Sequence, residues 1–111
     1  MNITSEEFKQ LIYDLANGSL DTEHFPIPES EYVENEYKEG SFCERKYAEV
    51  LDRYTHLCQR LNVPEWEDDD IEVIIDNLRD IGEHISKKMF EYGVFFAKKE
   101  LAEEKAQKPE T

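Results

Sequence analysis

Apolar residues recur along this chain at intervals of three and four positions, the spacing of an amphipathic helix. The first such stripe consists of Phe8, Leu11, Ile12 and Leu15. It predicts a helix over residues 5–16. Thr4 and Glu7 stand at the spacing of a capping box in front of it. Asn17-Gly18 follows as a typical helix stop, because glycine readily adopts the left-handed conformation there.

A second stripe recurs at intervals of four, three, four and three within residues 42–61. Its members are Tyr47, Leu51, Tyr54, Cys58 and Leu61. Residues 17–29, which contain two prolines, are expected to form a loop, and residues 30–38 a further helical stretch. Gly40 interrupts the pattern, while Ser41 and Glu44 offer another capping box. Residues 30–62 are therefore expected to form either two helices or one helix bent at Gly40.

The last helix is predicted to begin at the acidic run Asp68–Asp70 and to end near residue 104. Its apolar stripe is Ile71, Ile75, Leu78, Gly82, Ile85, Met89, Tyr92 and Phe96. A helix of about 50 Å is too long for a compact domain of this size. It therefore either bends at Gly82 or Gly93, or projects and packs against a second copy, with Met89, Tyr92, Phe95 and Phe96 at the seam.

No segment alternates between apolar and polar residues with the period of a strand. The chain is thus predicted to be all-α, a small bundle of three to four helices with one long C-terminal helix. Residues 1–104 are expected to form a single domain and residues 105–111 a disordered tail. The 111-residue length suits one domain.

Several short segments occur in an order that resembles an uncharacterised family of small, all-helical bacterial and phage proteins. They are Leu15-Ala16-Asn17-Gly18, a proline-bearing loop, two long helices and Phe90-Glu91-Tyr92-Gly93-Val94-Phe95-Phe96-Ala97. The likeness covers about residues 10–100. It implies a helical fold and a bacterial or mobile-element origin, and it implies no activity, because that family has none assigned.

Charge narrows the range of partners. The chain has 27 Asp and Glu against 13 Lys and Arg, a formal net charge of −14. Such a chain lacks the basic excess that binds a nucleic-acid backbone directly, and anionic membranes repel it. The N-terminal residues have no signal-peptide pattern, and no apolar run approaches the length of a membrane span. We expect a cytoplasmic protein of a bacterium or a phage-infected cell, with Cys43 and Cys58 reduced.

The acids concentrate in two zones, residues 1–41 and 63–84, each with a net charge of −8. The first zone contributes Glu31, Glu34 and Glu36 as candidate partner-binding residues. The second contributes Glu65, Glu67, Asp68, Asp69 and Asp70, followed by Glu72, Asp76, Asp80 and Glu83. The last four are spaced four, four and three, so we expect an acidic ladder on one helix face, opposite the apolar stripe. Trp66, between Pro64 and the acidic run, either anchors a partner or folds back on the domain.

The acidic face permits two interpretations. It is either only a solvated face, or a mimic of the nucleic-acid backbone that occupies the basic groove of a DNA- or RNA-binding protein. Small acidic phage proteins that block CRISPR nucleases (anti-CRISPR proteins) are similar in size and charge. The leading hypothesis is such an inhibitor, binding a basic, nucleic-acid-binding protein. The alternative is a helical adaptor or structural module that dimerises through its C-terminal helix.

Catalysis is not expected. His56 and Cys58 lie two positions apart on one helix and therefore face different directions. The chain has no Gly-rich phosphate loop, no CxxC pair and no Glu-x-x-His motif of a di-iron bundle. The acidic run lacks the glycine and terminal glutamate of a calcium loop. We therefore expect no enzyme activity, no cofactor and no metal.

Overall fold

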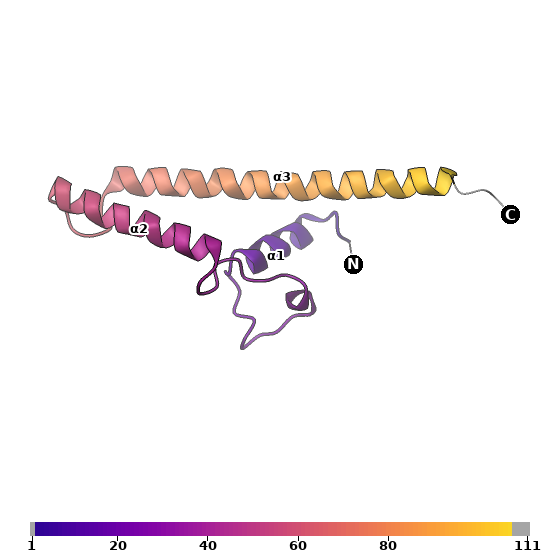
Figure 1. The fold of residues 1–111 in the computed structure, drawn as a ribbon, viewed down its shortest axis with the longest axis horizontal. Helices are drawn as coiled ribbons and strands as arrows, with labels where there is room; N and C mark the ends of the chain where they lie inside the picture. The colour runs from indigo at the N-terminus through magenta and orange to yellow at the C-terminus, as the bar shows by residue number, and fades with distance from the viewer. Residues whose placement is uncertain (1, 108–111) are drawn as a thin grey trace.

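Three α-helices and one 3-10 turn make up the fold, as seen in a computed structural model that describes residues 2–107 (Figure 1). They are α1 (Glu6–Ala16), η1 (Pro28–Glu31), α2 (Phe42–Leu61) and α3 (Asp69–Gln107). The described residues contain no strand, so the predicted all-α class with a long C-terminal helix is confirmed. In Figure 1, α2 and α3 form an antiparallel hairpin, and α1 lies beside the middle of α3.

The start of α1 differs from the prediction in its capping residue. Ser5 is the N-cap, and its hydroxyl accepts a hydrogen bond from the Phe8 amide at 3.1 Å. The predicted Thr4–Glu7 capping box is therefore wrong, because Thr4 bonds to the side chain of Asn2 instead. The predicted stop is confirmed: Gly18 follows the C-cap with φ +75°, a left-handed conformation that favours glycine.

The segment between α1 and α2 folds back over the end of α1 without forming the helix predicted at residues 30–38. Only Pro28–Glu31 forms a turn of 3-10 helix. The Glu36 amide donates to the carbonyl of Ala16 at 2.8 Å, and the Tyr37 amide donates to the side chain of Asn35 at 2.8 Å. Because these amides bond outside any local helix, the single bent helix is wrong, and of the two helices expected within residues 30–62 only the second, over residues 42–61, is present as an α-helix.

A single α-helix, α2, begins after Ser41, whose hydroxyl accepts from the Glu44 amide at 3.2 Å. The Ser41 half of the expected capping box is thereby confirmed, whereas Glu44 accepts from the Gly40 amide at 3.1 Å and not from the amide of the N-cap residue, which bonds to the Lys38 carbonyl. At its other end, Asn62 adopts a left-handed conformation with φ 59° and starts the connection to α3. Tyr54 and Cys58, two members of the predicted stripe, are the buried residues of α2.

The last helix, α3, is uninterrupted over 39 residues, about 58 Å at 1.5 Å per residue. Neither Gly82 nor Gly93 breaks it, so the predicted bend is wrong; the helix projects, and its packing against a second copy stays a prediction. Its C-terminal part extends beyond α1 (Figure 1), and the molecule measures 76 × 30 × 24 Å. The helix ends at Gln107, so residues 105–107 of the predicted tail are helical, and residues 108–111 lie outside the described part.

The buried interior is small for a chain of this length. Among the described residues, the buried side chains are Leu15, Tyr54, Cys58 and Lys9. No residue of α3 is buried, although α3 is the longest element. A helix with this many apolar residues ordinarily buries one face against its own domain. In this protein α1 and α2 cover only part of it.

Candidate functional site: a polar groove and an uncovered apolar face

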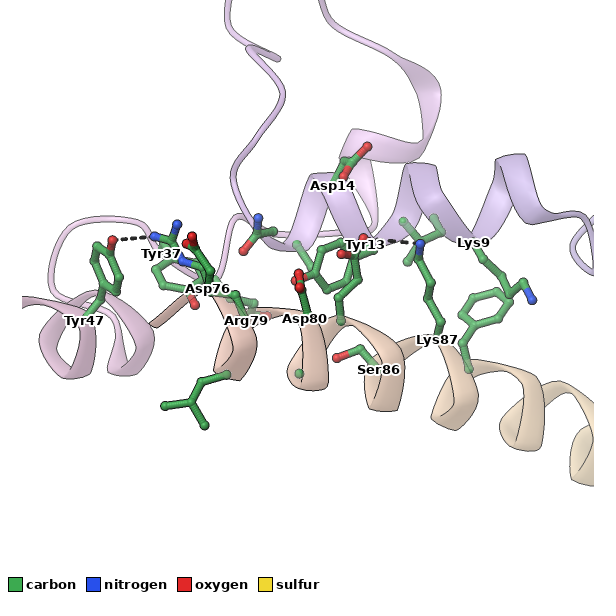
Figure 2. A pocket seen from close by; sticks show the side chains of 18 of the residues that line it. Lys9, Tyr13, Asp14, Tyr37, Tyr47, Asp76, Arg79, Asp80, Ser86 and Lys87 are labelled. Carbon is green, nitrogen blue, oxygen red and sulfur yellow. Dashed lines mark hydrogen bonds and ion pairs between the residues drawn. The ribbon is translucent and has the colours of Figure 1, made fainter. Parts of the chain in front are cut away.

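A groove of about 1270 Å³ lies where α1, the segment around Tyr37, the start of α2 and the first half of α3 meet. Figure 2 shows its polar lining. Tyr13 comes from α1, Tyr47 from α2, and Asp76, Arg79 and Asp80 from α3. The groove is wide and open to solvent, so its side chains are accessible to a macromolecule.

Two sets of polar contacts bridge the helices along this groove. Near α2, the Arg79 guanidinium donates to the Tyr47 hydroxyl and lies 5.1 Å from the centre of that ring (Figure 2). Near α1, the Lys87 ammonium donates to the Gln10 side chain and pairs with Glu83 at 3.2 Å. Arg79, the one Lys or Arg within residues 69–84, is thus already engaged by an aromatic ring.

Lys9 secures α1 to α3 at the end of the groove. It is 5% exposed, and its ammonium contacts Glu6 at 2.7 Å and Glu91 of α3 at 3.2 Å. The hydrogen bond to Glu6 raises the pKa of Lys9, and the same bond lowers the pKa of Glu6. The rings of Phe8 and Phe90 pack beside this pair, with centroids 6.0 Å apart.

The predicted acidic ladder lies on the side of α3 that α1 and α2 flank, and not on the opposite, fully exposed side. Glu72 accepts a hydrogen bond from the Tyr54 hydroxyl at 2.9 Å, and Glu83 is held by Lys87. Asp76 and Asp80 are exposed on the groove. The expected continuous outward ridge is therefore corrected: half of the ladder bonds within the chain, because helix packing uses the same face.

Burial and the hydrogen bond to Glu72 raise the pKa of Tyr54 to about 12. The same hydroxyl lies 3.1 Å from the Asp68 amide and 3.1 Å from the Asp68 carbonyl. Tyr54 therefore fastens the middle of α2 to the first turn of α3. This contact orients the acidic run relative to the groove.

The residues of the acidic run have different roles. Asp68 is the N-cap of α3, because its carboxylate accepts from the Ile71 amide at 3.0 Å. Glu65 accepts from the Thr55 hydroxyl at 3.0 Å, and the Trp66 indole donates to the same hydroxyl at 3.0 Å. Trp66 thus folds back toward α2, yet 50% of it stays exposed. Three further acids of this run are exposed: Glu67, Asp69 and Asp70.

The candidate acids of the first zone are not gathered at one place. Glu31 ends η1, and Glu34 pairs with Lys38 at 3.1 Å. Glu36 lines the groove together with Asp76 and Asp80, so it is the one member that joins the second zone. Pairing of distant segments places it there, and no local pattern in the sequence signals such pairing. The same holds for Tyr13, Tyr37 and Tyr47, which also line the groove and which no local pattern in the sequence places there.

The second feature is an apolar surface on α3 that no other element covers. We call it the uncovered face, and its side chains are 54–63% exposed: Ile74, Leu78, Ile81, Ile85, Met89, Tyr92, Phe95 and Phe96. The side toward α1 and α2 carries a different, half-buried apolar set, Ile75, Phe90 and Val94, and Ile71 lies at the boundary between the two sides, where it lines the hollow described next. The predicted stripe mixed these two sets, because a long helix with two apolar sides gives overlapping patterns.

A smaller hollow of about 440 Å³ opens between α2 and the start of α3. Its apolar lining comes from Val50 and Leu57 of α2 and from Ile71 and Ile75 of α3. Val50 and Leu57 are 43% and 38% exposed. The hollow adds apolar surface on the α2 side of the uncovered face.

Comparisons of the chain with protein-family models, with curated proteins and with solved structures gave no match. The resemblance of residues 10–100 to a bacterial and phage helical family and the likeness to anti-CRISPR proteins stay predictions from the sequence. Within residues 2–107, no three His, Cys, Asp or Glu side chains converge as metal ligands. None of the helices described there is both long and apolar enough to cross a bilayer.

Proposed function

We propose that this protein is a non-catalytic, helical interaction protein that pairs with a second copy of itself through the uncovered face of α3. The observation that carries the proposal is the exposure of eight large apolar side chains, each more than half accessible, along one side of one helix. Monomeric proteins rarely expose a contiguous apolar surface larger than a few hundred Å². A row of this length is typical of a helix–helix interface.

The size of the uncovered face suits a stable pair. With roughly 100 Å² accessible on each of its large side chains, eight from each copy would remove about 1,600 Å² from water, the size of a standard protein–protein interface. α1 and α2 pack on the other side of α3, so neither blocks the approach of a second helix. The function follows from assembly: two copies of the polar groove are held in one particle.

The mass of the particle in solution tests this proposal. Sedimentation equilibrium is expected to give about twice the 13.2 kDa of the chain. The variant Ile81→Glu places a carboxylate in the middle of the uncovered face and is expected to return the mass to that of one chain. Ile81 is 55% exposed within a single chain, so the helical circular dichroism of this variant is expected to persist.

Val73→Glu is the matched control. Val73 is 57% exposed on the same helix but lies outside the uncovered face, so this variant is expected to remain paired. A wild-type mass of 13.2 kDa at all concentrations would refute the proposal. Equal loss of pairing in both variants would show that charge alone, and not the position of the face, disrupts the particle.

The groove favours a second candidate function, the binding of a basic, nucleic-acid-binding protein by charge mimicry. Asp76, Asp80 and Glu36 line the groove, and the nearby Arg79 is occupied by Tyr47. Exposed carboxylates on a concave surface can accept charge-assisted hydrogen bonds from Arg and Lys side chains. The two functions are compatible, because the groove carboxylates lie outside the uncovered face, which shares only Leu78 with the lining of the groove.

The double variant Asp76→Lys/Asp80→Lys tests this second candidate. Retention of the protein on a basic nucleic-acid-binding protein is expected to fall with rising salt for the wild type and to be lost in the double variant. Glu103→Lys/Glu104→Lys is a control with the same charge change at the far end of α3. Equal retention of both variants would refute a role for the groove carboxylates.

A further inference from the structure

We infer that the two copies pair antiparallel, with the aromatic C-terminal part of one uncovered face seated against the hollow between α2 and α3 of the other. This inference rests on the proposed function, since it specifies the orientation of the same pair. Three observations on α3 favour it: its charge gradient, the position of one lysine in the seam, and the location of the hollow.

The charge of α3 differs between its halves. Residues 69–84 carry six acids and one base, a net charge of −5, whereas residues 85–107 carry four acids and five bases, a net charge of +1. A parallel pair places the two acidic halves side by side. An antiparallel pair places each acidic half along the near-neutral half of the other copy, which removes most of that repulsion.

The apolar positions of α3 follow a heptad repeat, the spacing that lets two helices interlock along a seam. The seam positions are Ile71, Ile74, Leu78, Ile81, Ile85, Lys88, Tyr92 and Phe95. Lys88 is the one charged residue among them. In a parallel pair the two Lys88 ammoniums would face each other across the seam. In an antiparallel pair centred near residue 83, Lys88 faces Leu78 of the other copy and its charged end reaches solvent.

The hollow supplies a place for the aromatic end of α3. Ile71 belongs both to the hollow and to the seam, so a helix that follows the seam passes the mouth of the hollow. In the antiparallel register, Phe95 of the other copy lies opposite Ile71. Phe96, the next residue of that copy, lies on the lateral edge of the seam that also carries Ile75. Phe95 and Phe96 stack edge to face with centroids 5.2 Å apart and are 59% and 60% exposed. A parallel pair would leave the hollow empty.

Distances between spin labels test the orientation. Single cysteines are introduced as Asn77→Cys, His84→Cys or Lys98→Cys, all at exposed positions along one edge of the seam. The background carries Cys43→Ser, and Cys58, which is 1% exposed, is left in place. Antiparallel pairing predicts axial offsets between the two labels near zero at position 84, about 20 Å at position 77 and about 45 Å at position 98.

The three possible outcomes separate the two proposals. Distances that increase from position 84 to 77 to 98 support the antiparallel pair. Short and equal distances at all three positions overturn the orientation and leave the pairing itself intact. No coupling between labels, together with a mass of 13.2 kDa, overturns the proposed function.

Filling of the hollow is tested by Phe96→Ala, with Phe42→Ala as its control. Phe42 is 64% exposed at the start of α2 and lies outside the hollow and the seam. The dissociation constant of the pair is expected to rise at least tenfold for Phe96→Ala, as for an aromatic anchor seated in a pocket, and less than twofold for Phe42→Ala. An equal effect of the two substitutions would overturn the seating of the aromatic end in the hollow.

Discussion

Replacing Ile85 by alanine is the most direct quantitative probe of the uncovered face. Ile85 lies in the middle of α3 and is 54% exposed in a single chain. Alanine is the best helix former, so the substitution is expected to leave α3 intact while shortening one side chain of the seam. Its effect therefore falls on pairing and not on folding.

The magnitude follows from the apolar surface that pairing would cover. Ile85→Ala removes three carbon groups, worth about 0.8 kcal/mol each when fully buried. Because 54% of the side chain is exposed before pairing, roughly 1.3 kcal/mol of that loss belongs to the pair in each copy. Two copies give about 2.5 kcal/mol, which corresponds to a rise of about 70-fold in the dissociation constant.

Sedimentation velocity over a dilution series measures this constant directly. Val73→Ala serves as the control, because Val73 is 57% exposed and immediately precedes the uncovered face on the same helix. It is expected to change the constant by less than twofold. The reasoning is refuted if Ile85→Ala pairs as tightly as the wild type, or if Val73→Ala weakens the pair to the same degree.

Three further predictions concern stability. Gly18→Ala is expected to lower the free energy of unfolding by about 1–2 kcal/mol in chemical denaturation, because φ is +75° and a Cβ would overlap the side chain of Asn35. Gly93→Ala is expected to raise it by about 0.5–1 kcal/mol, since the added Cβ would meet nothing within 4 Å beyond the adjoining backbone of its own helix, and glycine weakens a helix interior. Tyr54 has a pKa of about 12 in the folded protein against an ordinary 10.0. Its contribution to the free energy of unfolding is therefore complete below pH 10 and is lost as the pH rises toward 12. Tyr54→Phe is therefore expected to lose less stability than the wild type over that interval, measured by denaturation at each pH.

The three α-helices can be predicted from the spacing of apolar residues along the chain. The stripe in α2 is confirmed for Tyr54 and Cys58, which are buried as the period of 3.6 requires, but its last member, Leu61, is 54% exposed. The helix predicted at residues 30–38 was wrong because tertiary contacts override weak local preference there. The Glu36 amide bonds to Ala16, and Asn35 packs against Gly18, two contacts that no window of the local sequence contains.

The acidic ladder illustrates a different limit of sequence reasoning. The spacing of Glu72, Asp76, Asp80 and Glu83 correctly places them on one face of a helix, but spacing does not say which face the neighbouring helices approach. Tyr54 and Gln10 approach this face, so Glu72 and Glu83 serve packing, while Asp76 and Asp80 remain accessible. Candidate partner contacts within the ladder are thereby reduced to two residues.

The uneven covering of α3 links its packing to its proposed role. A helix that buried its apolar residues within one chain would have one apolar side, and the rest of its surface would be polar. Here Phe90 already packs on Phe8 of α1, and Ile71 and Ile75 line the hollow beside α2, while a second, longer row of apolar side chains remains exposed. A chain with a charge of −14 has polar residues in excess, so this second row is not a consequence of composition. The free-energy cost of exposing this row to water is offset only when a partner covers it. The charge gradient of α3 makes an antiparallel copy of the same helix the best complement.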